Sequence, residues 1–270
     1  MARYKHTELG KQTSYTDQYD PSLLCPIPRD EARPATFSTK DLPFKGVDLW
    51  TAYELSWLNA DGLPQIAIAE FLVPCDSASI TESKSLKLYL NSYSQTQFAS
   101  HEQVKQRLID DLSSAVGGSV EVTLYQISEF NGFKPIAEPQ GNCIDHEPVT
   151  IDCYEPNPAL LQVQGSEAVE ETLYSHLLKS NCPVTDQPDW ASVYITYKGP
   201  KIDPAALLKY IVSYRQQQDF HELCVESIFT DIMQCCKPCE LTVYACYLRR
   251  GGIDINPFRS TCYTSPPVSY

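Results

Sequence analysis

The stretch LKLYLNSYSQTQFASHEQVKQRLIDDLSSAVGGSVEVTLYQI, residues 86–127, recurs in altered form as LLKYIVSYRQQQDFHELCVESIFTDIMQCCKPCELTVYACYL, residues 207–248. The two stretches align without a gap at a constant offset of 121 residues. Identical residues fall at Leu86/Leu207, Tyr89/Tyr210, Ser92/Ser213, Tyr93/Tyr214, Gln95/Gln216, Gln97/Gln218, Val104/Val225, Asp110/Asp231 and Val122/Val243. Because the order of helical and strand patterns also agrees, the sequence predicts a fold built by duplication.

Each copy predicts a helix followed by a strand. In the first copy, Ser100 and Gln103 have the spacing of a capping box, and Gly117 ends the apolar helical periodicity before an alternating strand pattern over 119–127. In the second copy, Asp219 and Glu222 have the same capping-box spacing. That helix is expected to end at Lys237-Pro238, ahead of a strand over 241–248.

Further strand patterns cover 65–73 and 191–198, so the predicted fold class is α+β, with antiparallel sheets. Two segments rich in proline read as irregular connections. The expected organisation is an N-terminal arm over 1–45, a first module over 46–128, a linker over 129–166 and a second module over 167–270.

Composition limits the classes of partner. The formal net charge is -13 and the pI is near 4.8, so a nucleic-acid partner held by a basic face is not expected. The chain has no apolar run long enough to span a bilayer, which argues against a membrane partner. Eleven cysteines without a visible export signal predict reduced thiols and a cytoplasmic location.

The sharpest local motif is CPVTDQPDW, residues 182–190. Two prolines stiffen a loop that presents Cys182 and, seven residues later, Asp189. A thiolate needs a base or a lowered pKa to attack an electrophile, and a carboxylate can carry the proton. The competing interpretation is a buried thiol beside a proline turn, with Asp189 at the entry to a strand.

A second motif, FHE at 220–222, places His221 and Glu222 at the start of the second predicted helix. A histidine there can relay protons and a glutamate can bind a ligand. The competing interpretation makes Glu222 part of the capping box with Asp219.

A third motif, ESKSLKLY at 82–89, combines one acid with two lysines. The Glu82 carboxylate can accept paired N–H bonds from a purine-like base, and Lys84 and Lys87 can meet phosphate. A solvated turn is the alternative.

Arginines 249 and 250 precede Gly251 and Gly252, a pattern that suits a phosphate clamp or a surface hairpin turn. The chain has no G-x-G-x-x-G, so a dinucleotide is not expected to bind in the Rossmann manner. The C-x-x-C at Cys236 and Cys239 has no second Cys or His pair at zinc-finger distance and is taken as structural. The other histidines, His6, His101, His146 and His176, have no ligand-like spacing.

Together, ESKSLKLY, CPVTDQPDW and FHE resemble the motifs of the NADPH-dependent 7-cyano-7-deazaguanine reductases of queuosine biosynthesis, in the same order along the chain. The arrangement is similar to the long form of that family. The resemblance therefore implies two tandem tunnelling-fold modules, like that of GTP cyclohydrolase I, with antiparallel sheets that carry helices on one face.

The resemblance also implies a role for each motif residue. Cys182 would be the nucleophile that forms a thioimidate with the nitrile, Asp189 the general acid and base, and His221 a proton-transfer group. Substrate contacts would come from Glu82, Ser83, His221 and Glu222, and NADPH contacts from Ser83, Lys84, Arg250 and Gly251. No metal is implied.

Two other functions stay open on sequence grounds. One is a zinc-dependent purine or pterin cyclohydrolase of the same fold, and the other is a base-binding module without catalysis. Self-association as a homodimer is expected, because tunnelling-fold modules leave sheet edges that a second chain normally covers.

Overall fold

The computed structural model describes residues 15–33, 42–129 and 140–262, so parts of the expected arm, linker and C-terminus lie outside it. The chain divides into two compact units. Unit 1 comprises Met1–Leu42, Asp48–Pro135 and Arg249–Ile255, and unit 2 comprises Pro43–Val47, Ile136–Leu248 and Asn256–Tyr270. The module boundaries expected from the sequence, at 45, 128 and 166, stay a prediction.

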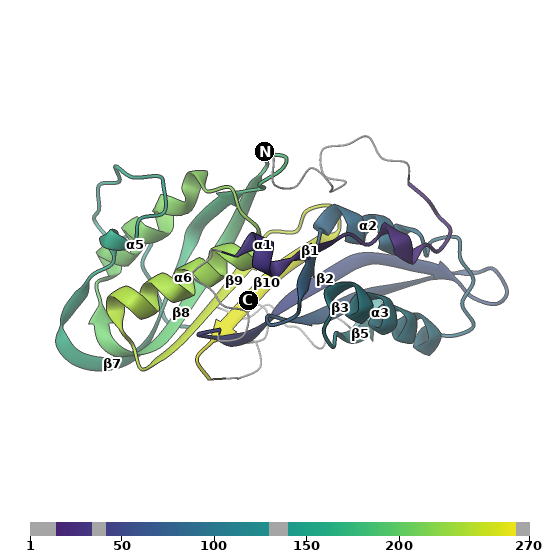
Figure 1. The fold of residues 1–270 in the computed structure, drawn as a ribbon, viewed down its shortest axis with the longest axis horizontal. Helices are drawn as coiled ribbons and strands as arrows, with labels where there is room; N and C mark the ends of the chain where they lie inside the picture. Colours follow the sequence, from purple (N-terminus) through teal and green to yellow (C-terminus); the bar gives the residue numbers. More distant parts are fainter. Residues whose placement is uncertain (1–14, 34–41, 130–139, 263–270) are drawn as a thin grey trace. The chain divides into compact units, whose positions relative to one another are not determined.

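Unit 1 is a small antiparallel sheet with two longer helices (Figure 1). Its elements are η1 (Pro21–Leu23), β1 (Pro26–Pro28), α1 (Arg29–Ala32), β2 (Lys45–Leu58, whose first residues belong to unit 2), β3 (Pro64–Pro74), β4 (Ser79–Thr81), α2 (Ser83–Asn91), α3 (His101–Val116) and β5 (Glu121–Tyr125). The strand order is β5-β3-β2, and β1 pairs separately with β4.

The ends of α3 are those that the sequence predicts. The Ser100 side chain accepts a hydrogen bond from the Gln103 backbone N–H, and the Gln103 amide oxygen accepts one from Ala99 N–H. Gly117 ends the helix in the left-handed conformation, at φ 67°, which glycine adopts without strain. Val104, Leu108 and other apolar residues of this helix lie in the core of the unit.

Unit 2 has longer strands. Its elements are β6 (Asn142–Cys143), η2 (Pro158–Leu160), β7 (Val163–Asn181), β8 (Pro188–Ile202), α5 (Pro204–Ser213), η3 (Tyr214–Gln216), α6 (His221–Cys236) and β9 (Glu240–Tyr247). The strand β10 (Ile253–Ser260) begins in unit 1 and ends in unit 2. The strand order is β10-β9-β8-β7-β6, antiparallel except for the short parallel pair β6–β7.

The sheet of unit 2 buries one face. Along β8, Val193, Ile195 and Tyr197 are buried, whereas Thr196 and Lys198 alternate with them and are exposed. The helices α5 and α6 lie along these strands (Figure 1) and bury apolar residues such as Ile228. This α+β arrangement agrees with the fold class predicted from the sequence.

The same tyrosine cluster occurs in both units. In unit 1 the hydroxyls of Tyr89 and Tyr93 lie 2.6 Å apart, and Tyr89 donates to Asp111 Oδ2 at 2.7 Å. In unit 2 the hydroxyls of Tyr210 and Tyr214 lie 2.9 Å apart, and Tyr210 donates to Asp231 at 2.6 Å. These equivalent contacts support the duplication that the sequence predicts.

The cluster also corrects the alignment of the two copies. The structural counterpart of Asp231 is Asp111, at an offset of 120, and not Asp110. The helices α3 and α6 begin at His101 and His221, again an offset of 120, whereas Tyr89 and Tyr210 keep the offset of 121. The ungapped alignment is therefore wrong by one residue over α3 and α6, because the connection ahead of α6 is one residue shorter.

The capping box predicted at Asp219 is also wrong. The N-cap of α6 is Phe220, and no side chain makes a capping hydrogen bond there. The Asp219 carboxylate instead accepts from the neighbouring Phe220 N–H at 2.9 Å. Glu222 thus occupies the second position of the helix and does not complete a capping box.

Within the described ranges, no helix combines the length and the apolar composition that crossing a bilayer requires. None of the eleven cysteines forms a disulfide, as the sequence predicts.

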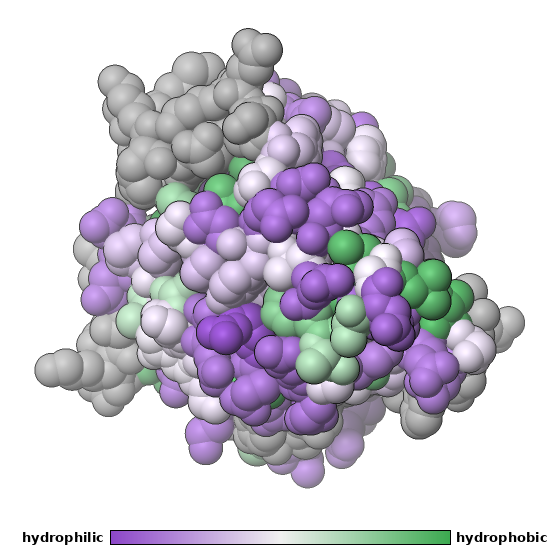
Figure 2. Space-filling view, turned by 90° about the vertical axis from the view of Figure 1, so that its right-hand side faces the viewer, coloured by the Kyte–Doolittle hydropathy of each residue, from purple (hydrophilic) through white to green (hydrophobic). Residues whose placement is uncertain are grey.

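Figure 2 shows a mostly hydrophilic face with apolar residues gathered in a limited area. Exposed large apolar side chains include Leu63 and Ile66 in unit 1 and Trp190 and Leu248 in unit 2.

Candidate active site

Cys182 follows β7 directly, in the turn that leads into β8. The last strand pairs are Ser180 with Asp189 and Asn181 with Pro188. The Cys182 N–H donates to the Gln187 carbonyl at 2.9 Å, which closes the turn. The turn thus holds the thiol and the carboxylate of the CPVTDQPDW motif at the same end of one hairpin, and both residues are buried, at 6% and 5% exposure.

The start of α6 is tied to the same hairpin. The Asn181 N–H donates to the Gln217 carbonyl at 2.7 Å, and the Asp219 N–H donates to the Asn181 carbonyl at 3.1 Å. These two bonds hold the residues before α6 against the residue that precedes Cys182. As a result His221, the first residue of α6, lies with its Nε2 3.3 Å from Asp189 Oδ2.

The imidazole of His221 has a fixed orientation. Its ring stacks on that of Tyr247, with centroids 3.7 Å apart and planes 4° from parallel. Burial, followed by the nearby Cys224 thiol, holds the pKa of the Tyr247 hydroxyl well above its usual value. Tyr247 is therefore a neutral aromatic platform, and sequence reasoning did not identify it because 26 residues separate it from His221.

Cys224 lies close to this group but is unsuited to attack. The residue is buried in α6, at 1% exposure. Burial first, and then the charge of Asp219, hold the pKa of its thiol well above the usual value. Because a thiol must ionise to react, this environment makes Cys224 inert.

Glu222 is buried beside His221, at 2% exposure, in the first turn of a helix without a side-chain cap. The N-terminus of a helix carries partial positive charge and N–H groups that need partners. The equivalent end of α3 is capped by Ser100. The N-cap residue of α6, Phe220, thus makes no side-chain capping bond, whereas the N-cap residue of α3, Ser100, makes one.

Unit 1 has a counterpart of this hairpin without its reactive groups. The Asn59 N–H donates to the Leu63 carbonyl at 3.0 Å, as the Cys182 N–H does to Gln187. This bond places Asn59 at the position of Cys182, and Gln65 at the position of Asp189. His101 and Glu102 correspond to His221 and Glu222, and both are exposed.

Glu82, predicted to bind substrate, is the N-cap of α2. Its two carboxylate oxygens accept from the backbone N–H groups of Lys84, at 2.6 Å, and Ser85, at 2.9 Å. The residue is fully buried, and burial raises the pKa of its carboxyl group, while those two N–H groups and the charges of Lys87 and Lys84 lower it. Ser83 is the first residue of α2 and is partly exposed, like Lys84. The substrate role of Glu82 and Ser83 stays a prediction.

Arg250 and Gly251 belong to a tight turn in unit 1. Gly251 and Gly252 both have positive φ, at 57° and 79°, and Arg250 and Ile253 exchange hydrogen bonds across them. This is the hairpin-turn interpretation of the sequence. The neighbouring Arg249 lies over the ring of Tyr53, 4.6 Å from its centroid.

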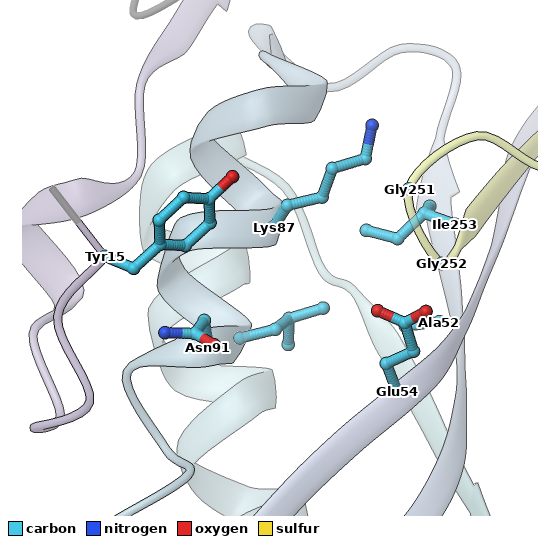
Figure 3. Close-up of a pocket in the computed structure, with 9 residues that line it drawn as sticks. Tyr15, Ala52, Glu54, Lys87, Asn91, Gly251, Gly252 and Ile253 are labelled. Carbon is cyan, nitrogen blue, oxygen red and sulfur yellow. The ribbon is translucent and has the colours of Figure 1, made fainter. Parts of the chain in front are cut away.

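A cavity of about 240 Å³ opens beside this turn. Figure 3 shows Lys87 of α2 pointing toward the loop of Gly251 and Gly252, and Glu54 of β2 lying beside that loop; Asn91 of α2 also lines the cavity. The Lys87 side chain lies so close to Gly251 that a Cβ there would be 3.3 Å from it. The absence of a side chain at Gly251 thus keeps room beside a lysine, which suits a bound phosphate.

The predicted site residues fall into two groups. Unit 2 brings Cys182, Asp189, His221 and Glu222 together at one end of a hairpin and the start of α6. Glu82, Ser83, Lys84, Arg250 and Gly251 belong to unit 1, at the start of α2 and in the turn before β10. Sequence reasoning missed Tyr247 and Glu54, since neither belongs to a recognisable motif.

Comparisons with known proteins agree with these motifs. The family described as "Nitrile reductase, 7-cyano-7-deazaguanine-reductase N-term" matches residues 15–124, and the family described as "QueF-like protein" matches residues 188–266. The first range includes Glu82, and the second includes Asp189 and His221, whereas Cys182 lies between the two.

Curated relatives match nearly the whole chain. A protein of Cupriavidus metallidurans is 53% identical over 269 residues, which cover 98% of this chain and 96% of the relative. One from Burkholderia lata is 55% identical, over 97% of this chain and 95% of the relative. Both are named "NADPH-dependent 7-cyano-7-deazaguanine reductase". A solved structure, an archaeosine synthase QueF-Like in the apo form, covers 37% of this chain at 17% identity and a TM-score of 0.32, and no argument is based on it.

These matches define the chain as an oxidoreductase. The chain belongs to the family of NADPH-dependent 7-cyano-7-deazaguanine reductases, as the sequence motifs predict.

Proposed function

We propose that this chain reduces the nitrile of 7-cyano-7-deazaguanine to the aminomethyl group of 7-aminomethyl-7-deazaguanine, for queuosine biosynthesis, through a thioimidate on Cys182. The observation that carries the proposal is the 3.3 Å contact between Asp189 and His221 at the turn end of the hairpin that holds Cys182. This arrangement supplies a nucleophile, a carboxylate that exchanges protons and an imidazole within one buried site.

In the first step the Cys182 sulfur forms a bond to the nitrile carbon, and one of the two π bonds of the carbon–nitrogen triple bond breaks. The thiol proton passes to the nitrogen through Asp189, so the product is a neutral thioimidate. His221, whose ring stacks on the ring of Tyr247, orients the Asp189 carboxylate and encloses the substrate.

Glu222 is suited to recognise the base. A buried carboxylate next to helix N–H groups can accept the paired N–H bonds of a guanine-like edge. Because Phe220 is the N-cap, Glu222 is not required for a capping box. Glu82 and Ser83 would complete the substrate contacts, with the Glu82 carboxylate keeping lone pairs beyond the two that its helix uses.

NADPH supplies hydride when bound, and reduction of a nitrile to an amine consumes two hydride equivalents. Of the residues assigned to NADPH, Gly251 lines the cavity, together with the Lys87 ammonium group and the Glu54 carboxylate. Ser83 and Lys84 precede Lys87 on α2, and Arg250 precedes Gly251. We assign the NADPH contacts to Ser83, Lys84, Arg250 and Gly251.

We further propose tandem tunnelling-fold modules, a homodimer and a cytoplasmic location. The duplicated tyrosine clusters support the first, and the eleven free thiols support the last. The exposed apolar side chains and the outer edge of β7, of which β6 covers only two residues, support association. A sedimentation experiment that finds only monomer at micromolar concentration would contradict the dimer.

The central test is mass spectrometry of the protein mixed with the cyano base without NADPH. We expect the mass of one substrate per chain to be added, at Cys182. Cys182→Ala should show neither adduct nor turnover, and Asp189→Asn should form the adduct more slowly. Cys239→Ala, at an exposed thiol of unit 2, is the matched control and should behave as wild type. An adduct or turnover in Cys182→Ala would overturn the mechanism, and metal-dependent turnover would favour the cyclohydrolase.

A further inference from the structure

A short segment of unit 2, residues 141–147, is fixed against the outer edge of β7. Cys143 pairs in parallel with Tyr174, and the Ile144 N–H donates to the Tyr174 carbonyl at 3.0 Å. Ile144 is buried, at 1% exposure. Gly141 approaches β7 so closely that a Cβ there would lie 2.4 Å from the Thr172 carbonyl oxygen. The positions of the side chains that follow are therefore set by paired backbone and not by a loose loop.

The strand β7 has an irregularity at the same place. Its register with β8 shifts between Ser175 and Leu178, so His176 lies in a bulge. The Asp145 carboxylate accepts from the Ser175 hydroxyl at 2.6 Å and from the His176 N–H at 3.0 Å. Bulges commonly redirect a side chain, and here the bulge brings His176 to the segment that carries Cys143.

The His176 ring is itself oriented. Its Nδ1 lies 2.7 Å from Ser192 Oγ, and its ring packs edge-on to Tyr174, with centroids 5.3 Å apart. The hydroxyl partner at Nδ1 orients the ring, and a ring held in place by a partner at one nitrogen is typical of histidines that bind metals. The hydrogen bonds of Asp145 explain how the bulge is stabilised, but they give no reason for a thiol and an imidazole at its side.

The three side chains form a ligand set. One ligand atom from each of Cys143, Asp145 and His176 lies within 4.8 Å of the other two. Tetrahedral zinc with bonds of about 2.0–2.3 Å holds its ligand atoms about 3.5 Å apart, so modest side-chain rotations would close the site. Cys143 and His176 are exposed, which lets an ion reach them from solvent.

We propose that Cys143, Asp145 and His176 bind a zinc ion, with water at the fourth position. A thiolate, an imidazole and a carboxylate together suit a borderline-soft ion, whereas magnesium and calcium prefer oxygen ligands alone. The site is separate from nitrile reduction. Ser192 lies on the solvent-facing side of β8, whereas Asp189 and Ala191 are on its buried side.

The ion would join the segment 141–147 to the hairpin whose other end carries Cys182 and Asp189. A ligand that binds only the folded state stabilises it in proportion to its concentration. We therefore expect zinc to raise the melting temperature and to slow hydrogen exchange of residues 141–147, without a need for zinc in catalysis.

The test is titration of the reduced protein with cobalt(II), which replaces zinc and reports on its ligands by absorption. We expect one ion per chain, tetrahedral d–d bands and a thiolate-to-metal charge-transfer band, all reversed by zinc. Cys143→Ser and His176→Ala should each weaken zinc binding by more than about tenfold, since loss of an outer hydrogen bond to a ligand alone costs roughly 10–100-fold.

Matched controls separate this site from other thiols and histidines. His146→Ala removes an exposed histidine next to Asp145, Cys239→Ser removes an exposed thiol, and Cys182→Ser removes the proposed nucleophile. All three should bind cobalt as wild type does, and Cys143→Ser should keep full reductase activity in chelator. Absence of the charge-transfer band in wild type, or its persistence in Cys143→Ser, would overturn the proposal. Loss of reductase activity in Cys182→Ala bears only on the proposed function.

Discussion

The rings of His221 and Tyr247 are stacked face to face, 3.7 Å apart and within 4° of parallel. One comes from the first turn of α6 and the other from the end of β9, so the stack joins a helix to the sheet beneath it. The same imidazole reaches Asp189 at 3.3 Å. Tyr247 is thus a positioning residue that holds the histidine in the plane from which it reaches the carboxylate.

Replacing Tyr247 tests this role. Tyr247→Phe keeps the stacked ring and should keep activity, whereas Tyr247→Leu should lower kcat roughly fivefold, as expected for loss of an aromatic contact worth about 1 kcal/mol. Steady-state kinetics and the pH profile of kcat measure the effect. Tyr244→Leu, at an equally buried tyrosine of β9, should lower stability without changing the pH profile. An unchanged pH profile in Tyr247→Leu would show that the stack does not position His221.

Glu222→Gln should weaken binding of the base by about 1.5–3 kcal/mol, because a charge-assisted hydrogen bond is replaced by a neutral one. Calorimetric titration with the base measures this. The matched control is Glu102→Gln, at the counterpart position of α3, which is exposed and should bind normally. Wild-type affinity in Glu222→Gln would remove Glu222 from substrate recognition.

The substrate role of Glu82 can be tested against Asp203, which caps the equivalent helix of unit 2. Glu82 caps α2, and Asp203 caps α5 by accepting from Ala205 and Ala206 N–H groups. Substituting either with alanine should cost about 1 kcal/mol of unfolding free energy. Only Glu82→Ala should also raise the KM for the base. Equal KM values in the two variants would restrict Glu82 to its capping role.

The shifted register of the two copies gives a stability test. Asp111 accepts hydrogen bonds from Tyr89 and Tyr19, at 2.7 and 2.6 Å, whereas Asp110 is exposed and contacts Gln106. Asp111→Ala should therefore lower the free energy of unfolding by about 1.5–3 kcal/mol. Asp110→Ala should leave it essentially unchanged. Chemical denaturation distinguishes the two, and equal losses would favour the ungapped alignment.

Arg250→Ala should raise the KM for NADPH roughly tenfold and the KM for NADH much less, because the extra phosphate loses a charged partner. Arg249, held over Tyr53, is the control, and Arg249→Ala should affect both cofactors equally. Equal effects of Arg250→Ala on NADPH and NADH would assign the phosphate to another cation, such as Lys84.

The sequence predicted the elements in which the local pattern of apolar and polar residues matches the burial of those residues in the structure. The helix α3 has a capping box, an apolar face and a terminal glycine, and its bounds followed from them. The strand β10 gave no such signal. Its residues are buried throughout, and Arg259 is satisfied by Glu226 and by backbone carbonyls that no local pattern reveals.

The sequence predicted the site residues that lie in short motifs, but not the residues that only the fold brings next to them. Cys182, Asp189 and His221 lie in two short motifs, and the structure joins them through hydrogen bonds of Asn181. Tyr247 has no such motif. His176 has no ligand-like spacing in the sequence, because its neighbours Cys143 and Asp145 lie about thirty residues earlier, on a segment expected to be irregular. Only the paired backbone of β6 brings them together.

The one-residue difference between the copies falls in the connection before the second long helix of each unit. A residue lost inside a helix would rotate everything beyond it by about 100°, and Asp231 would turn away from Tyr210. Ahead of the helix, the difference leaves the buried faces of both helices intact and changes only how each helix starts. The length of the connection before the helix therefore decides which residue becomes its N-cap, Ser100 in α3 and Phe220 in α6.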